Sequence, residues 1–141
     1  MRLTEQSRYA LRVLAHCAVQ HPALAKVAAI AAVTGITEQN IFKLIKTLTK
    51  AGLVQTIRGP HGGVRLARAP GAIRVGQVIR AIEPRFRACG PLGQMMSDAP
   101  VSAVERELDR TIGRGIAAFM EALDQTSIAA LVAKTSAANA A

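Results

Sequence analysis

The feature that most limits how this chain can fold is a capped helical pattern followed at once by a glycine-rich hairpin pattern. The segment TEQNIFKLIKTLTKAG begins at Thr37, a helix-capping residue type, and ends at Gly52, which tolerates a left-handed turn. The segment LVQTIRGPHGGVRLAR follows, with two short runs that contain β-branched residues around a loop of glycine, proline and histidine. This pair predicts a mainly α fold with a small β-hairpin.

Further helical patterns surround this pair. Apolar residues recur at helical spacing from Thr4 to His21, then over about residues 26–33, and again in IRVGQVIRAIE after the hairpin. Helix, short helix, turn, helix and hairpin is the order of a winged helix-turn-helix, a module whose third helix enters the major groove of DNA. We assign residues 1–83 to this module.

The rest of the chain predicts a loop and a long helix. Residues 84–100 contain three prolines and two glycines without periodicity, which is typical of an exposed loop. Residues 101–141 predict a long helix and a short terminal one. The long helix carries an apolar stripe that a lone helix cannot bury, so it either lies along the first helix or pairs with its copy in a second subunit. Pairing is the more economical arrangement, so we expect a homodimer. The residues expected to form the dimer contact are Leu108, Ile112, Ile116, Phe119 and Leu123.

Charge is concentrated at one end of the chain. The formal net charge is +9, and residues 1–87 hold 14 Lys and Arg against 3 Asp and Glu, whereas residues 88–141 hold 4 against 6. A basic module with a slightly acidic tail indicates a polyanionic partner, here double-stranded DNA. The aromatic content of 3% disfavours readers of carbohydrate and single-stranded RNA. No apolar run is long enough for a membrane span and no signal peptide is evident, so we expect a cytoplasmic protein.

An enzyme and a protein-interaction module are the competing functional classes. His16, His21 and His61 lie far apart in sequence, and no Gly-x-Ser-x-Gly, Walker or HExxH pattern is present, so we assign no catalytic residues. A protein-interaction module that presents its basic face to an acidic partner, without binding DNA, remains an alternative.

Four segments carry a resemblance to a known family. In order and spacing, SRYALRVL, GITEQNIFKLIKTLTKAGLV, RGPHGGVRLAR and IRVGQVIRAIE resemble the Rrf-two (Rrf2) family of bacterial transcription regulators, which includes IscR, NsrR and CymR. The resemblance implies a dimeric winged-helix regulator, here expected to be a repressor, that reads pseudo-palindromic promoter DNA.

The position of the third helix and the resemblance suggest the DNA contacts. Side chains at the amino end of that helix can reach base edges, and those further along contact phosphates. The resemblance implies that the wing enters the minor groove. The expected contacts are Thr37, Glu38, Gln39, Asn40, Lys43, Lys46, Arg58, Gly59, His61, Gly62, Gly63 and Arg65. The simpler interpretation is that the lysines are only solvated, the glycines only form the turn and Glu38 only stabilises the helix dipole.

The chain differs from several family members in the residues that could hold an iron-sulfur cluster. Several members hold an iron-sulfur cluster with three cysteines in the loop before the long helix and a further ligand from elsewhere. Here that loop has only Cys89, Arg8 stands where some members offer an aspartate, and Cys17 lies on an apolar helix face. We therefore expect no metal ligands and no conventional cluster. The signal could instead be redox state or nitric oxide sensed by Cys89 beside basic residues, an atypical cluster, a small ligand or a protein effector. The alternative for Cys89 itself is that it has no function.

Overall fold

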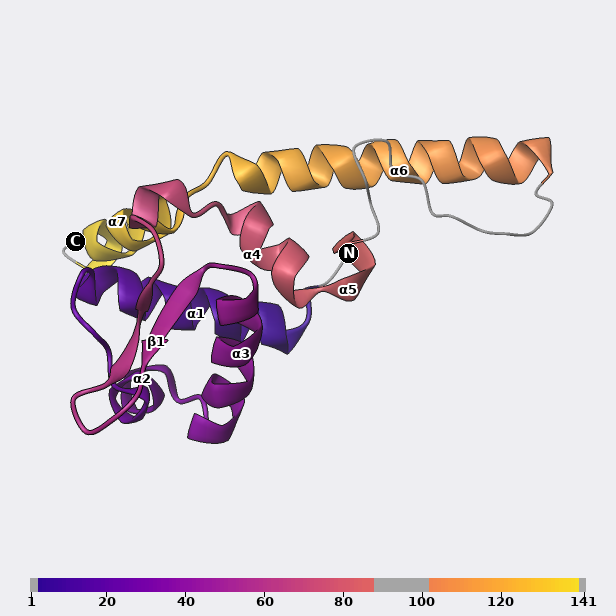
Figure 1. The fold of residues 1–141 in the computed structure, drawn as a ribbon. Helices are drawn as coiled ribbons and strands as arrows, with labels where there is room; N and C mark the ends of the chain where they lie inside the picture. Colours follow the sequence, from indigo (N-terminus) through magenta and orange to yellow (C-terminus); the bar gives the residue numbers. More distant parts are fainter. Residues whose placement is uncertain (1–2, 88–101, 140–141) are drawn as a thin grey trace.

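A computed structural model describes residues 3–87 and 102–139 of the chain (Figure 1). Helices account for most of these residues, and the strands within them form one two-stranded sheet. The mainly α fold with a small β-hairpin is confirmed. The elements are α1 (Glu5–Gln20), α2 (Val27–Thr34), α3 (Glu38–Lys50), β1 (Val54–Ile57), β2 (Gly63–Leu66), the 3-10 turn η1 (Pro70–Ala72), α4 (Val75–Ile82), α5 (Pro84–Arg87), α6 (Ala103–Asp124) and α7 (Ile128–Asn139).

Helix α1 lies at the centre of the head, by which we mean α1 to α4 together with the hairpin. The hydroxyl of Thr4 caps α1 by accepting a hydrogen bond from the Ser7 amide at 3.4 Å. The helix packs against α2, α3, α4, α7 and β2, and Leu14 and Cys17 have no exposed surface. Burial raises the pKa of the Cys17 thiol to about 11, so this thiol stays protonated and serves as core, as predicted.

Helices α2 and α3 form the predicted helix-turn-helix. Gly35, with φ of 69°, closes α2 in the left-handed conformation that favours glycine. The Thr37 hydroxyl then caps α3 by accepting from the Asn40 amide at 3.4 Å. The guanidinium of Arg12 donates to the Thr34 carbonyl, which ties the turn to α1. The turn is thus fixed by its own capping residues and by a contact from the central helix.

The hairpin is attached to the head along its second strand. β1 and β2 pair antiparallel, with Val54 opposite Leu66 and Ile57 opposite Gly63. Val64 also exchanges two backbone hydrogen bonds with Ala25, of 2.8 and 2.9 Å. This bridge joins the hairpin to the segment just before α2, so the hairpin cannot swing independently of the helix-turn-helix.

A second apolar cluster joins α4, α5 and α6. Val75, Ile79, Phe86 and Met120 are its buried members, and the rings of Phe86 and Phe119 lie 6.0 Å apart. Where the sequence predicts a loop from residue 84 onward, Pro84–Arg87 form a short helix. Proline suits a first helical turn, and Phe86 gains burial there, being 2% exposed. Residues 88–101, the rest of the predicted loop, lie outside the described residues.

Helix α6 begins in a capping box and ends against α4. The Ser102 amide donates to the Glu105 carboxylate at 2.8 Å, and the Glu105 amide donates to the Ser102 hydroxyl at 3.2 Å. At the other end, Arg80 donates two hydrogen bonds to the Asp124 carboxylate, at 3.1 and 2.7 Å. Figure 1 shows the amino-terminal half of α6 extending past α4 and α5.

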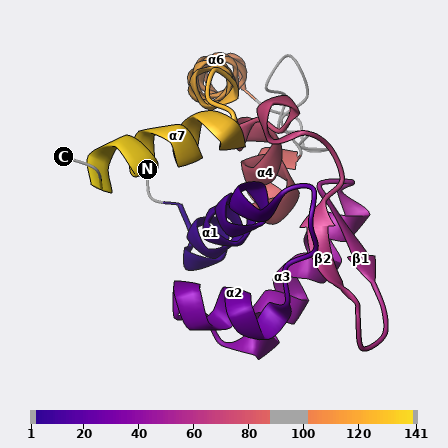
Figure 2. The same ribbon diagram turned by 90° about the vertical axis from the view of Figure 1, so that its left-hand side faces the viewer.

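The chain after α6 returns to the head. The Val75 amide donates to the Thr126 carbonyl and the Ile128 amide to the Ile73 carbonyl, each at 2.9 Å. Ile128 has no exposed surface, and α7 packs against α1 and η1 (Figure 2). The last helix therefore completes the burial of the first. No helix in the ranges 3–87 and 102–139 combines the length and the apolar character that a membrane span requires.

Glu83 ties the beginning of α1 to the end of α4. Its carboxylate is 3% exposed and accepts hydrogen bonds from the Thr4 amide and the Ser7 hydroxyl, each at 2.8 Å, and Arg85 lies 3.3 Å away. Burial acts to raise the pKa of Glu83, but these hydrogen bonds and the charge of Arg85 outweigh it and hold the pKa below its usual value.

We expect Glu83→Gln to lower the free energy of unfolding by about 1–3 kcal/mol at pH 7, because a charged acceptor is replaced by a neutral amide. A depressed carboxyl pKa stabilises the fold above the unfolded pKa of about 4.3, and this contribution is lost as the pH falls through the lower folded value. Urea unfolding at pH 7 and pH 3.5 should therefore show the difference between the two proteins shrinking at the lower pH. An unchanged difference would mean that charge on Glu83 is not what stabilises this junction.

Candidate DNA-binding surface

Helix α3 has one buried side and one exposed side. Ile41, Leu44, Ile45 and Leu48 are buried, and they fix the helix on the head. The exposed residues occupy the opposite side, as the 100° step between successive helical residues requires. They are Glu38, Gln39, Phe42, Lys43, Lys46, Thr49 and Lys50, with Asn40 half-buried at the edge.

This exposed side is cationic and its cations are unpaired. Residues 37–65 hold five Lys and Arg against one Glu. Within the described part of the chain, Lys43, Lys46 and Lys50 take part in no ion pair. Charged groups on a helix are commonly neutralised by neighbours, so an unpaired row of lysines leaves positive charge available to a polyanion.

Glycines at the tip of the wing, residues 58–63, are required by its geometry. Gly59 has φ of 103°, and its carbonyl accepts from the Gly62 amide at 2.9 Å to close the turn. A Cβ at Gly62 would lie 2.0 Å from the Ile57 carbonyl oxygen, and one at Gly63 would lie 2.6 Å from that of Ala25. Both of these oxygens belong to the backbone, so the chain itself would have to move. The wing glycines thus have a structural role whether or not they approach DNA.

The wing also has a side-chain support. The ammonium group of Lys26 donates to the Pro60 carbonyl at 2.7 Å, across the gap between α2 and the tip. Arg58 and His61 are exposed at the tip. Arg65 lies opposite Gln55 on the outer face of the sheet and donates to its side-chain oxygen at 3.4 Å. The wing therefore presents its basic groups from a supported backbone.

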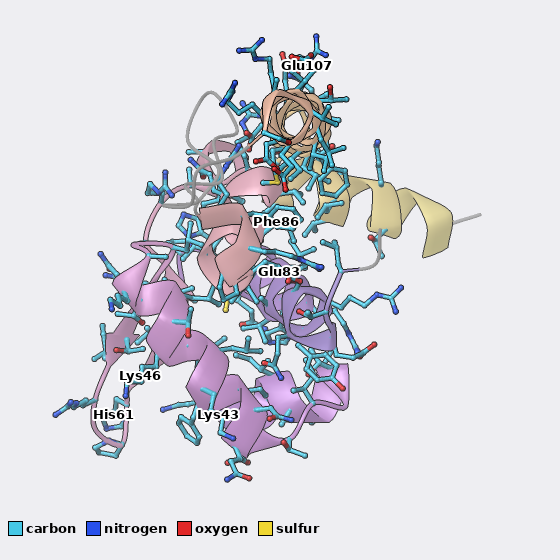
Figure 3. The ribbon with its side chains drawn as sticks, turned by 90° about the vertical axis from the view of Figure 1, so that its right-hand side faces the viewer. Lys43, Lys46, His61, Glu83, Phe86 and Glu107 are labelled. Carbon is cyan, nitrogen blue, oxygen red and sulfur yellow. The ribbon has the colours of Figure 1, made fainter. Side chains whose placement is uncertain are left out.

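The predicted contact residues lie on two elements at one end of the molecule. Figure 3 shows Lys43 and Lys46 on α3 and His61 at the wing tip. All three lie on the side of the molecule away from Glu107 on α6. Figures 1 and 2 agree that α6 lies at the end opposite α2 and the wing tip. Of the predicted set, Gly62 is buried and Gly63, Asn40 and Arg65 are half-buried, so these four offer less surface than the rest.

Three residues that shape this surface were not predicted. Lys26 supports the wing, Arg12 holds the turn before α3, and Phe42 is exposed beside the lysines. Of the three, only Phe42 could have been identified from the sequence, because helical spacing places it next to the exposed lysines and not among the buried residues of α3. The other two act through contacts with backbone carbonyls, which leave no trace in local sequence.

Known proteins and solved structures are similar to more than nine-tenths of the chain. The model of the family Rrf2, described as an iron-dependent transcriptional regulator, matches residues 3–134. The chain belongs to the Rrf2 family. Protein aau3 of Rhizobium meliloti (strain 1021) is 37% identical over 134 residues, which are 94% of this chain and 85% of that protein. The HTH-type transcriptional regulator NsrR of Bacillus licheniformis is 33% identical over 129 residues, covering 91% of this chain and 90% of the relative.

Among solved structures, CymR (YrzC), the global cysteine regulator of B. subtilis, has a TM-score of 0.70 at 29% identity, covering 95% of this chain and 98% of CymR. The Rrf2 resemblance and the winged-helix fold expected from the sequence are confirmed. Rrf2 proteins are transcriptional regulators, a class that is not enzymatic. Their winged-helix architecture agrees with the placement of α3 and the wing described above.

We expect Gly62→Ala to destabilise this Rrf2 protein by about 1–3 kcal/mol, because the added methyl group would displace the backbone of the wing. Gly71→Ala is the matched control, since a Cβ at Gly71 would have no neighbour within 4 Å and should change stability by less than about 0.5 kcal/mol. Urea unfolding of the three proteins measures both effects. Equal stability of the two variants would show that the wing accommodates a side chain at position 62.

Proposed function

We propose that the chain is a homodimeric repressor that reads a pseudo-palindromic site in promoter DNA through α3 and the glycine-rich wing, in the cytoplasm. The observation that carries this proposal is the exposed, unpaired row of lysines on α3 beside the supported wing. Membership of a family of transcriptional regulators supports the same function. A basic helix of this size fits the major groove of duplex DNA.

The amino-terminal half of α3 is assigned to base readout. The Gln39 and Asn40 side chains suit bidentate bonding to adenine, and the Lys43 ammonium suits the acceptors of guanine. Glu38 suits the amino group of cytosine, in addition to stabilising the helix dipole. Lys46 and Lys50 follow on the same exposed side and suit phosphate contacts, which position the helix without reading sequence.

The wing is assigned to the neighbouring minor groove. Arg58 and His61 are exposed at its tip, and Arg65 lies further along β2. Narrow A/T-rich minor grooves carry enhanced negative potential and attract arginine. The Lys26 contact and the Ala25 bridge hold the wing in a fixed position relative to α3. The spacing between the major-groove contact of α3 and the minor-groove contact of the wing is therefore fixed by the head.

We expect Lys43→Ala to reduce binding to the operator by a factor corresponding to about 1–3 kcal/mol while changing binding to unrelated DNA much less. Lys50→Ala should weaken both alike and lower the salt slope by about one. Fluorescence anisotropy with operator and scrambled duplexes over a salt series measures both effects.

Lys134→Ala is the matched control for these variants, since Lys134 is exposed on α7, away from α3 and the wing. It should bind as the unmodified protein does. Equal losses from Lys43→Ala and Lys50→Ala would refute the assignment of Lys43 to base readout. Absence of salt-dependent DNA binding, together with capture of an acidic protein partner, would favour the protein-interaction module.

Dimerisation is assigned to the amino-terminal half of α6. Val104, Leu108 and Ile112 are 77%, 55% and 45% exposed and lie four residues apart on one side of the helix. Further along, Ile116, Phe119 and Leu123 are half-buried against the cluster of α4 and α5 in the same chain. Among the described residues, the amino-terminal half of the apolar stripe of α6 is therefore the half that no other element buries. Pairing with a second copy of α6 would bury it.

We expect Leu108→Glu to convert the dimer into monomers with an intact head, because a carboxylate would have to be buried at the helix pair. Ala117→Glu places the same charge on the opposite, exposed side of α6 and should leave the dimer intact. Light scattering gives the mass, and circular dichroism checks the fold. A dimeric Leu108→Glu protein would place the dimer contact elsewhere.

We also propose that the signal is not a conventional iron-sulfur cluster, although the family is described as iron-dependent. The chain has two cysteines, and Cys17 is buried with a pKa of about 11, which leaves one thiol for such a role. Cluster ligation uses several thiolates or imidazoles, and the described residues contain no group of three His, Cys, Asp or Glu. These donors do not fit a cluster within one chain. Cys89, the predicted sensor, lies outside the described residues.

A further inference from the structure

We propose that Phe42 reads thymine in the operator, by packing its ring against the C5 methyl group in the major groove. This inference rests on the proposed function, since it requires that α3 lies in that groove. It adds an apolar contact to a surface otherwise composed of charged and polar side chains. The residues assigned above to base readout, Glu38, Gln39, Asn40 and Lys43, offer charged or hydrogen-bonding groups instead.

The Phe42 ring is exposed to solvent. Its exposed fraction is 57%, although burial of a phenylalanine side chain would stabilise the fold. The chain has four aromatic residues, and the other three lie in its interior clusters: Tyr9 packs on the core around α1, and Phe86 and Phe119 belong to the cluster of α4, α5 and α6. Phe42 belongs to neither cluster.

Phe42 lies among the residues of α3 that are assigned to DNA contact. Gln39 precedes it by three residues and Lys46 follows it by four, so both adjoin it on the exposed side of the helix. It immediately precedes Lys43, to which base readout is assigned. A ring among these three residues faces whatever the lysines face. If α3 enters the major groove, Phe42 enters with it, in the half of the helix nearest the base edges.

The major groove offers a partner for an apolar ring at one kind of base. Among the four base pairs, only those with thymine present an apolar group in the major groove, the C5 methyl. The ring cannot stack on a base inside an intact duplex, so the methyl group is the matching apolar surface. Lys43 and Gln39 read hydrogen-bonding groups, whereas Phe42 would distinguish thymine from cytosine and uracil by an apolar contact alone.

The test is a methyl scan of the operator. Footprinting first defines the site, and each thymine is then replaced singly by 2′-deoxyuridine, which removes only the methyl group. We expect one thymine in each half-site at which this replacement weakens the unmodified protein about fourfold, the value of roughly one buried methyl group. Phe42→Ala should bind the thymine and deoxyuridine duplexes equally at that position, and its melting temperature should be unchanged.

Val19→Ala is the matched control, because Val19 is also an exposed apolar residue, at 69% against 57% for Phe42, and lies on α1 instead of α3. This variant should keep the fourfold loss. The inference is overturned if the operator is bound specifically but no thymine shows the loss, or if Phe42→Ala retains it. Absence of any sequence-specific binding would instead overturn the proposed function and this inference with it.

Discussion

Burial of α1 on several sides at once is the constraint on which the rest of the structure depends. Ala10, Val13, Leu14 and Cys17 are fully buried, and α2, α3, α4, α7 and β2 all pack against this one helix. Close packing of this kind transmits changes in volume directly to the neighbours. The orientation of α3, and with it the direction of its lysines, follows from how α1 is enclosed.

Two polar junctions connect this core to the rest of the chain. Glu83 joins the start of α1 to the end of α4, and Arg80 joins α4 to the last turn of α6 through Asp124. At Gly76 a Cβ would lie 2.1 Å from the Asp124 carboxylate, so a side chain there would displace this carboxylate from its place beside Arg80. Helix α4 therefore couples the proposed DNA-binding end of the molecule to the helix proposed to pair two copies.

Local sequence predicted what local interactions determine. The cap Thr37, the left-handed Gly52 and the helical pattern of α3 are each set by residues within one or two turns, and the structure has them as expected. The Thr4 amide and Glu83 are 79 residues apart, and Arg80 and Asp124 are 44 apart. Such pairings depend on the tertiary arrangement, and neither periodicity nor composition encodes them.

The candidate site divides in the same way. The basic residues of α3 and the wing could be proposed from charge and spacing, whereas the Lys26 contact to Pro60 connects two segments whose proximity arises only from the Ala25 bridge to Val64. The short helix Pro84–Arg87 was missed because burial of Phe86 requires α6, which comes later in the chain. Both features depend on packing between segments that are far apart in the sequence, so local sequence patterns could not predict them.

The return of α7 to α1 has a consequence for dissecting the protein by deletion. A fragment cut after α4 would open one flank of the central helix to water and strip the Val75 amide and the Ile73 carbonyl of their protein partners. Helices α1 and α7 therefore form one folding unit, although residues 21–127 separate them in the sequence. Loss of function in a variant without α7 would report an unfolded winged helix as readily as loss of the proposed dimer.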